Sequence, residues 1–164
     1  MSARTKARKR ALDVLFEAEQ RSMPLDRALE ERLKVSGRET PLPPYAQELI
    51  RGVIERGREL DSIIVDAAPD WTLERMPAVD RNLLRIASWE ILCNDEVAPA
   101  VAIDEAVTLA SDLSTDDSPR FINGVLGRIT REAPALGSVT AETPAEDSRD
   151  IDGGSAAYSD FADD

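Results

Sequence analysis

The sequence predicts an all-helical cytoplasmic protein, and three observations support that prediction. Aromatic residues make up only 4% of the 164 residues, and Ala, Leu, Ile and Val supply most of the apolar content, which favours packed helices over a β-sandwich. Apolar residues recur at helical spacing in six segments, and no segment alternates long enough to form a strand. The single cysteine excludes an internal disulfide, which is typical of the reducing cytoplasm. We therefore expect a cytoplasmic protein that folds as a compact bundle of about six to seven helices.

The first three helices are separated by short connections that contain Pro or Gly. The first helix should bury one stripe that includes Ala7, Ala11 and Val14, and the second should begin at Pro24. The third is the longest, and it should stop before Pro69. The expected ranges are about 4–20, 24–35 and 45–67.

Three more helices follow in the second half of the chain. The fourth is apolar on more than one face, as is typical of a helix at the centre of a bundle. The fifth should bury a stripe through Ala102, Ala106 and Leu109, and the sixth should have Ser118 as N-cap and Pro119 at its first position. The expected ranges are about 78–93, 99–113 and 119–132.

The last part of the chain, residues 134–164, has a different composition. It carries eight acidic residues against one basic residue, Arg149, among Gly, Ser and Pro. Such a segment cannot bury enough apolar surface to offset the entropy lost on ordering. We therefore expect a helical domain over residues 1–133 and a disordered acidic C-terminal tail over 134–164. Without the tail's charge of -7, the net charge of -12 falls to -5.

Several kinds of chemistry are missing from the sequence. The chain has no histidine, which removes the usual general base and the commonest metal ligand together. It also lacks the glycine-rich motifs that bind nucleotide phosphates, and no run approaches the roughly 20 apolar residues of a membrane span. We therefore expect a non-enzymatic protein with no cofactor, no metal site and no membrane partner.

The first helix instead concentrates positive charge. In an acidic protein, a basic end indicates one oriented contact with a phosphate backbone. On a helical wheel Phe16 lies close to Lys9, and a cationic helix face beside an aromatic ring can hold phosphates and stack an unpaired base. A solubilising N-terminus with Phe16 in the core is an equally open interpretation. The five bases among the first ten residues are Arg4, Lys6, Arg8, Lys9 and Arg10.

The start of the sixth helix is a second candidate site. Backbone N–H groups at a helix start favour anions, and Arg120 and Phe121 lie beside them. The amide of Asn123 can both donate to and accept from a base edge. Gly124 and Gly127 lower the helix propensity, which indicates close approach either of another helix, the favoured interpretation, or of a ligand.

Four stretches of the chain match one known family in order. They are the basic first helix running into ALDVLF, then DRNLLRIA with WEIL, then VAIDEAV, and finally SPRFINGVL. Across these stretches, which lie between residues 4 and 132, the chain resembles the NusB family of bacterial transcription antitermination factors.

The resemblance implies two stacked helical subdomains and a non-catalytic role in antitermination of ribosomal RNA operon transcription. It implies a small-subunit ribosomal protein, acting as NusE, as partner, and single-stranded boxA-type RNA as ligand within the transcription elongation complex. Partner contacts are expected at Glu90 and at Trp89, where the family usually has Tyr. The full set of expected RNA contacts is Arg4, Lys6, Arg8, Lys9, Arg10, Phe16, Asp117, Arg120, Phe121 and Asn123.

Two alternative functions remain open. The first is a homodimeric helical interaction protein whose first helix is buried between two copies, and such a dimer would also serve as a resting form of the antitermination factor. The second is a NusB-like accessory module of a ribosomal RNA methyltransferase, which requires a Rossmann-type catalytic half after the helices.

Overall fold

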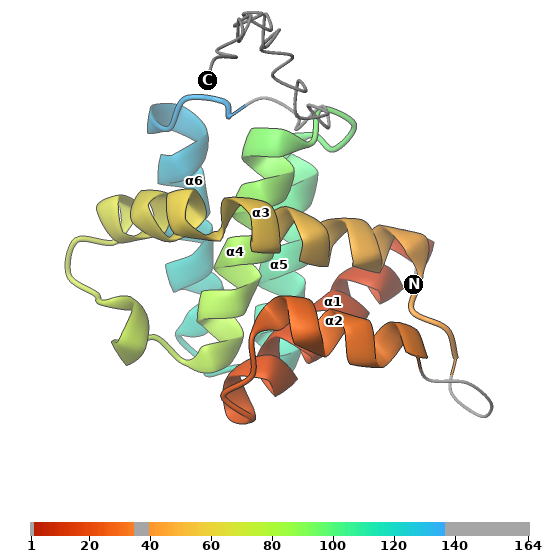
Figure 1. The fold of residues 1–164 in the computed structure, drawn as a ribbon. Helices are drawn as coiled ribbons and strands as arrows, with labels where there is room; N and C mark the ends of the chain where they lie inside the picture. The colour runs from red at the N-terminus through yellow and green to blue at the C-terminus, as the bar shows by residue number, and fades with distance from the viewer. Residues whose placement is uncertain (1, 35–39, 137–164) are drawn as a thin grey trace, which may run out of the picture.

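The computed structural model describes residues 2–34 and 40–136, and within them it contains six α-helices, one short 3-10 helix and no strand (Figure 1). This confirms the all-helical prediction. Of the predicted acidic tail, residues 137–164 lie outside the described part of the chain. No described helix is both long enough and apolar enough to span a bilayer. The elements are α1 (Ala3–Gln20), α2 (Leu25–Lys34), α3 (Pro44–Ala67), η1 (Leu73–Arg75), α4 (Ala78–Cys93), α5 (Pro99–Leu113) and α6 (Ser118–Glu132).

The helices form two groups that meet along α3 and α4. In the first group α1, α2 and α3 pack against one another, and in the second α4, α5 and α6 do the same. Contacts between α3 and α4, between α1 and α4, and between α3 and α6 join the groups. Figure 1 shows α3 crossing in front of α4, α5 and α6, so the arrangement is two stacked helical subdomains, as the resemblance implies.

Helix α4 is the centre of the bundle, as its apolar residues predict. It contacts α1, α3, α5 and α6, and it buries Leu83, Leu84 and Ile86 among other apolar residues. Unexpectedly, α4 also buries polar side chains, including Asp80 near its start and Glu90 near its end. Because a buried polar group is costly without a partner, each of these side chains must be satisfied by a neighbouring element.

The chain after α6 turns back onto the bundle. The backbone N–H of Leu136 donates to the carbonyl of Leu92 at 3.0 Å, and Arg56 donates to the carbonyl of Leu136 at 3.4 Å. Leu136 also packs against the apolar core. Residues 134–136 therefore contact the helical domain, although the sequence places its boundary at residue 133.

Two glycines of α3 have different surroundings. A Cβ built at Gly52 would lie 2.1 Å from the indole Nε1 of Trp89, so the close packing of α3 on α4 requires glycine there. Gly57 is only partly buried, and a Cβ there would meet nothing within 4 Å.

Alanine at these two positions should therefore have opposite effects. Gly52→Ala should lower the free energy of unfolding by about 1–3 kcal/mol, because the rigid, buried indole ring has to move. Gly57→Ala should raise it by about 0.5–1 kcal/mol, because alanine has the higher helix propensity. Urea denaturation followed by circular dichroism measures both, and equal effects of the two substitutions would contradict this description of the α3–α4 contact.

Candidate functional site

The basic residues of α1 do not share one surface. Arg8 is only 3% exposed, and its guanidinium forms a bidentate ion pair with Glu90 of α4, with Nε at 2.9 Å from Oε1 and Nη2 at 2.8 Å from Oε2. Glu90 is 1% exposed, so the pair is shielded from water. Burial alone lowers the pKa of Arg8, but the hydrogen bonds and the negative charge of Glu90 outweigh it and hold the pKa above its ordinary value.

This pair corrects two placements made from the sequence. Arg8 is predicted as an RNA contact and Glu90 as a partner contact, but both lie in the interior and satisfy each other. The physical reason is that α1 packs against α3 and α4 at once. The arc of α1 that becomes buried is therefore wider than the apolar stripe and includes the position of Arg8.

A tyrosine from α3 completes the buried network. The hydroxyl of Tyr45 donates to Oε2 of Glu90 at 2.6 Å, and burial together with this hydrogen bond raises the pKa of Tyr45 far above its ordinary value. The guanidinium of Arg4 also lies over the Tyr45 ring, 4.8 Å from the ring centroid, in a cation–π contact. Arg4 forms an exposed ion pair with Glu96 at 3.2 Å as well. Arg4 and Arg8, one helical turn apart, therefore both face Tyr45.

The remaining predicted residues of α1 stay at the surface. Lys6 and Lys9 are exposed, and no carboxylate in the described part of the chain lies within ion-pair distance of either. Arg10 is partly exposed and donates to the carbonyl of Thr40 at 2.9 Å. Phe16 is 38% exposed and therefore does not belong to the core. We call Lys6, Lys9, Arg10 and Phe16 the α1 surface.

The second predicted region forms a pocket of about 490 Å³, which we call the α6 pocket. Phe121 of α6 packs against Trp71, with ring centroids 5.7 Å apart and an angle of 57° between the rings. Arg75 and Arg120 are both exposed and line this pocket, so two basic side chains share it with the aromatic pair. The lining residues are Trp71, Arg75, Pro77, Asp80, Thr115, Asp117, Ser118, Arg120 and Phe121.

Asp80 holds the start of α6 against the start of α4. Its buried carboxylate accepts from the hydroxyl of Ser118 at 2.8 Å and from the hydroxyl of Ser114. Ser118 is predicted as the N-cap, but it is the first residue of α6, and the N-cap position belongs to Asp117, which makes no capping hydrogen bond. The Ser118 hydroxyl serves the contact with α4 instead, which fixes where Arg120 and Phe121 point.

Two residues of the α6 pocket were missed by sequence reasoning, namely Trp71 and Arg75. Trp71 is 46% exposed in the connection between α3 and η1. The sequence signal for Trp71 is a large aromatic residue in the short connection that follows Pro69, but its pairing with Phe121 depends on tertiary structure.

The other residues at the start of α6 are open to solvent. Asn123 and Asp117 are exposed, and a Cβ built at Gly124 would meet no protein atom within 4 Å. The favoured explanation for Gly124, close packing of another helix, is therefore not met.

An ionic network joins the end of α1 to the elements that form the α6 pocket. Glu19 accepts from Arg81, whose Nη1 also donates to the carbonyls of Leu73 at 2.8 Å and Met76 at 3.1 Å. Arg85 adds a second ion pair to Glu19 at 2.8 Å. Burial raises the pKa of Glu19, but the two guanidinium groups outweigh it and hold the pKa below its ordinary value.

The C-terminal end of the α1 surface, where Phe16 lies, is consequently at the same end of the molecule as the α6 pocket. Phe16 is about one turn before Glu19 on α1, and Glu19 contacts the start of α4 and, through Arg81, η1. Figure 1 shows the end of α1, η1 and the starts of α4 and α6 along the lower side of the bundle. The structure therefore brings together two regions separated by about 100 residues of sequence.

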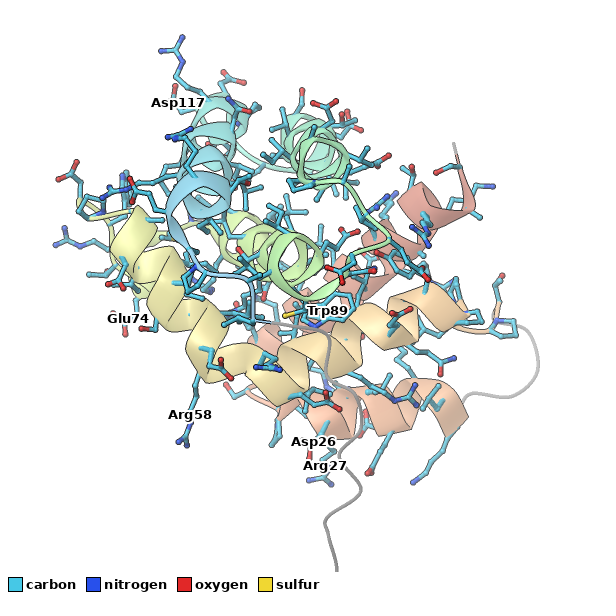
Figure 2. All side chains as sticks on the ribbon, turned by 90° about the horizontal axis from the view of Figure 1, so that it is seen from above. Asp26, Arg27, Arg58, Glu74, Trp89 and Asp117 are labelled. Atoms are coloured by element: carbon cyan, nitrogen blue, oxygen red, sulfur yellow. The ribbon has the colours of Figure 1, made fainter. Side chains whose placement is uncertain are left out.

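Trp89, the other predicted partner contact, lies between α3 and α4 (Figure 2) and is only 8% exposed. Its indole N–H edge is next to Gly52 and has no acceptor among the described residues. A buried donor without an acceptor costs roughly 1–3 kcal/mol. Trp89 therefore lies at the edge of the core with an indole N–H that lacks an acceptor, and it is not an exposed side chain.

Comparison with known proteins identifies what the chain is similar to. The sequence pattern of the NusB family matches residues 5–131. The transcription antitermination protein NusB of Beutenbergia cavernae is 49% identical over 144 residues, which cover 83% of this chain and 94% of that protein. The NusB of Paenarthrobacter aurescens is 51% identical over 136 residues, covering 83% and 98% of the two chains.

Solved structures show the same similarity. A crystal form of T. maritima NusB superposes with a TM-score of 0.70 at 33% identity, covering 82% of this chain and 94% of that one. A crystal structure of the antitermination factors NusB and NusE in complex with double-stranded RNA gives a TM-score of 0.63 at 25% identity, covering 78% and 96%.

The buried position of Arg8 predicts a large effect on stability. Arg8→Ala leaves Glu90 buried without its cation, and it should lower the free energy of unfolding by about 3–5 kcal/mol. Lys6→Ala, on the exposed side of the same helix, should change it by no more than about 0.5 kcal/mol. Chemical denaturation of the two variants distinguishes the positions, and an Arg8→Ala protein as stable as Lys6→Ala would show that the ion pair is not buried in solution.

Proposed function

The chain belongs to the NusB family, and from that premise we propose that it acts as a non-catalytic transcription antitermination factor. It binds boxA-type single-stranded RNA together with a small-subunit ribosomal protein that acts as NusE, and it promotes antitermination of ribosomal RNA operon transcription. The site of action is the transcription elongation complex in the cytoplasm. A solved NusB bound to NusE and double-stranded RNA supports an RNA ligand and a ribosomal protein partner for this chain.

The α6 pocket is the observation that supports RNA binding most directly. The faces of Trp71 and Phe121 can stack a base, and Arg75 and Arg120 can contact the phosphates next to it. The base must be unpaired, because in a duplex its neighbours cover both of its faces. Asp117 at the pocket can accept hydrogen bonds from the amino or imino groups of such a base.

The α1 surface extends this site along α1, from Phe16 near the α6 pocket toward Lys9 and Lys6 in the first half of the helix. Lys6 and Lys9 are free to neutralise phosphates, and Phe16 offers a second aromatic face. Arg8 does not take part, because Glu90 already satisfies its guanidinium. With only a few cations available, the chain should bind RNA weakly alone, and the partner supplies further affinity.

Two features of the comparisons favour this function over the alternatives. The matched relatives from B. cavernae and P. aurescens are named antitermination proteins, and the chain covers 94% and 98% of their length, so the matches favour antitermination over a role in a methyltransferase. A homodimer that covers the α1 surface is part of the proposal only as a resting state, since RNA and a second copy would compete for that surface.

The pocket predicts which aromatic residues matter for RNA. Trp71→Ala and Phe121→Ala should each weaken binding of a single-stranded boxA-type RNA by about 1–3 kcal/mol, because each removes a stacking face. Fluorescence anisotropy with labelled RNA and saturating ribosomal protein partner measures the affinity. Ile54→Ala, which truncates another exposed apolar side chain on α3, is the control and should bind as wild type does.

Circular dichroism establishes that each variant is folded before its affinity is compared. If folded Trp71→Ala and Phe121→Ala proteins both bind the RNA as tightly as Ile54→Ala, the α6 pocket is not the RNA site and the proposed function loses its structural support.

A further inference from the structure

Two residues that line the α6 pocket, Trp71 and Arg75, belong to the connection between α3 and α4 (Figure 1). Residues 69–75 of this connection are at most partly buried, and η1 within it has no side-chain cap. A 3-10 helix as short as η1, with three residues, has poorer hydrogen-bond geometry than an α-helix. The position of the two side chains therefore depends on contacts between this connection and the helices.

Arg81 of α4 makes such contacts with the backbone of the connection. Its Nη1 donates to the carbonyl of Leu73, the first residue of η1, at 2.8 Å, and to the carbonyl of Met76, just after η1, at 3.1 Å. Its Nε and Nη2 donate to the two carboxylate oxygens of Glu19 in α1. One planar guanidinium thereby ties η1 to α1 and to α4 at the same time.

Arg85, one helical turn later, has similar surroundings but no contact with the connection. It also pairs with Glu19, at 2.8 Å, and it donates to Asp61 of α3 at 2.7 Å and to Asn82 at 3.1 Å. The side chains of Arg81 and Arg85 are 16% and 19% exposed. The chain therefore contains a matched pair of arginines, of which only Arg81 reaches η1.

We propose that Arg81 is a positioning residue for RNA binding, which holds Trp71 in place for stacking without touching the RNA. This inference rests on the proposed function for the RNA ligand of the α6 pocket. Four of the five guanidinium N–H groups of Arg81 already donate to acceptors within the protein. Trp71 lies two residues before Leu73, so release of the Leu73 carbonyl loosens the backbone that carries the indole.

Lysine substitutions separate this positioning from stability. Arg81→Lys and Arg85→Lys both keep the positive charge and lose the bidentate guanidinium, so each preserves the long-range attraction of RNA and loses contacts with Glu19. With saturating ribosomal protein partner, full-length Arg81→Lys should bind single-stranded boxA-type RNA about fivefold more weakly than wild type, and Arg85→Lys should remain within about twofold. Fluorescence anisotropy measures the affinities, and equal affinities of the two folded variants would overturn the proposal.

A double-mutant cycle shows whether Arg81 acts through Trp71. If it does, Trp71→Ala/Arg81→Lys should bind RNA as Trp71→Ala alone does, because no indole is left to position. If the two losses add instead, Arg81 contacts the RNA itself or acts through another group, and the proposal is wrong.

A readout without RNA follows Trp71 directly. Trp71 is 46% exposed and Trp89, the other tryptophan, is 8% exposed, so acrylamide quenching of tryptophan fluorescence reports mainly on Trp71. Arg81→Lys should raise the quenching constant above that of Arg85→Lys, because the indole loses its fixed place against the Phe121 ring. Equal quenching of the two variants would overturn the proposal.

Failure of the proposed function is distinguishable from failure of this inference. If the wild-type chain binds no RNA with its partner present, the proposed function is wrong, and the quenching comparison still decides whether Arg81 holds Trp71. If wild type binds RNA and Arg81→Lys binds it equally well, the function stands and Arg81 is not a positioning residue.

Discussion

The ion pair between Arg8 and Glu90 is the interaction on which the rest of the structure depends. It joins the first helix to the central helix, and Tyr45 brings α3 to the same carboxylate. Any shift of α1 along α4 would leave two charges buried without partners, at a cost of about 3–5 kcal/mol. The pair thereby sets the rotation of α1, and this rotation decides that Lys6, Lys9 and Phe16 face outward while Arg8 does not.

Helix α4 also positions neighbouring elements at both of its ends. At its start, Asp80 receives the hydroxyl of Ser118 from α6, and Arg81 reaches Glu19 of α1 and the carbonyls around η1. At its end, Trp89 and the following turn border an acidic groove lined by Glu48, Glu55, Asp95 and Glu96. One buried helix therefore places an aromatic and cationic pocket at one end and an anionic groove at the other.

The sequence predicted most of the fold because helix periodicity and Pro or Gly punctuation are local properties. The six helices and the central position of α4 follow from them, and the region around Arg120 and Phe121 was recognised as a site candidate. What the sequence could not predict was pairing across the bundle. Arg8 looks like any other cation of α1 until Glu90 is placed opposite it, and Trp71 looks like an isolated loop residue until Phe121 packs against it. Ser118 likewise has the residue type of a helix N-cap, but its hydroxyl donates a hydrogen bond to Asp80 instead.

The most direct test of this account separates the structural cation of α1 from those that face outward. Arg8→Met/Glu90→Gln removes the buried charges together and leaves Tyr45 an acceptor, so the variant should fold. The salt dependence of its binding to single-stranded RNA, measured with the partner present, should match wild type in slope and in affinity within about twofold. If the folded variant instead loses about tenfold in affinity and its slope falls by about 0.7, which corresponds to one lost phosphate contact, then Arg8 binds RNA and the central claim is wrong.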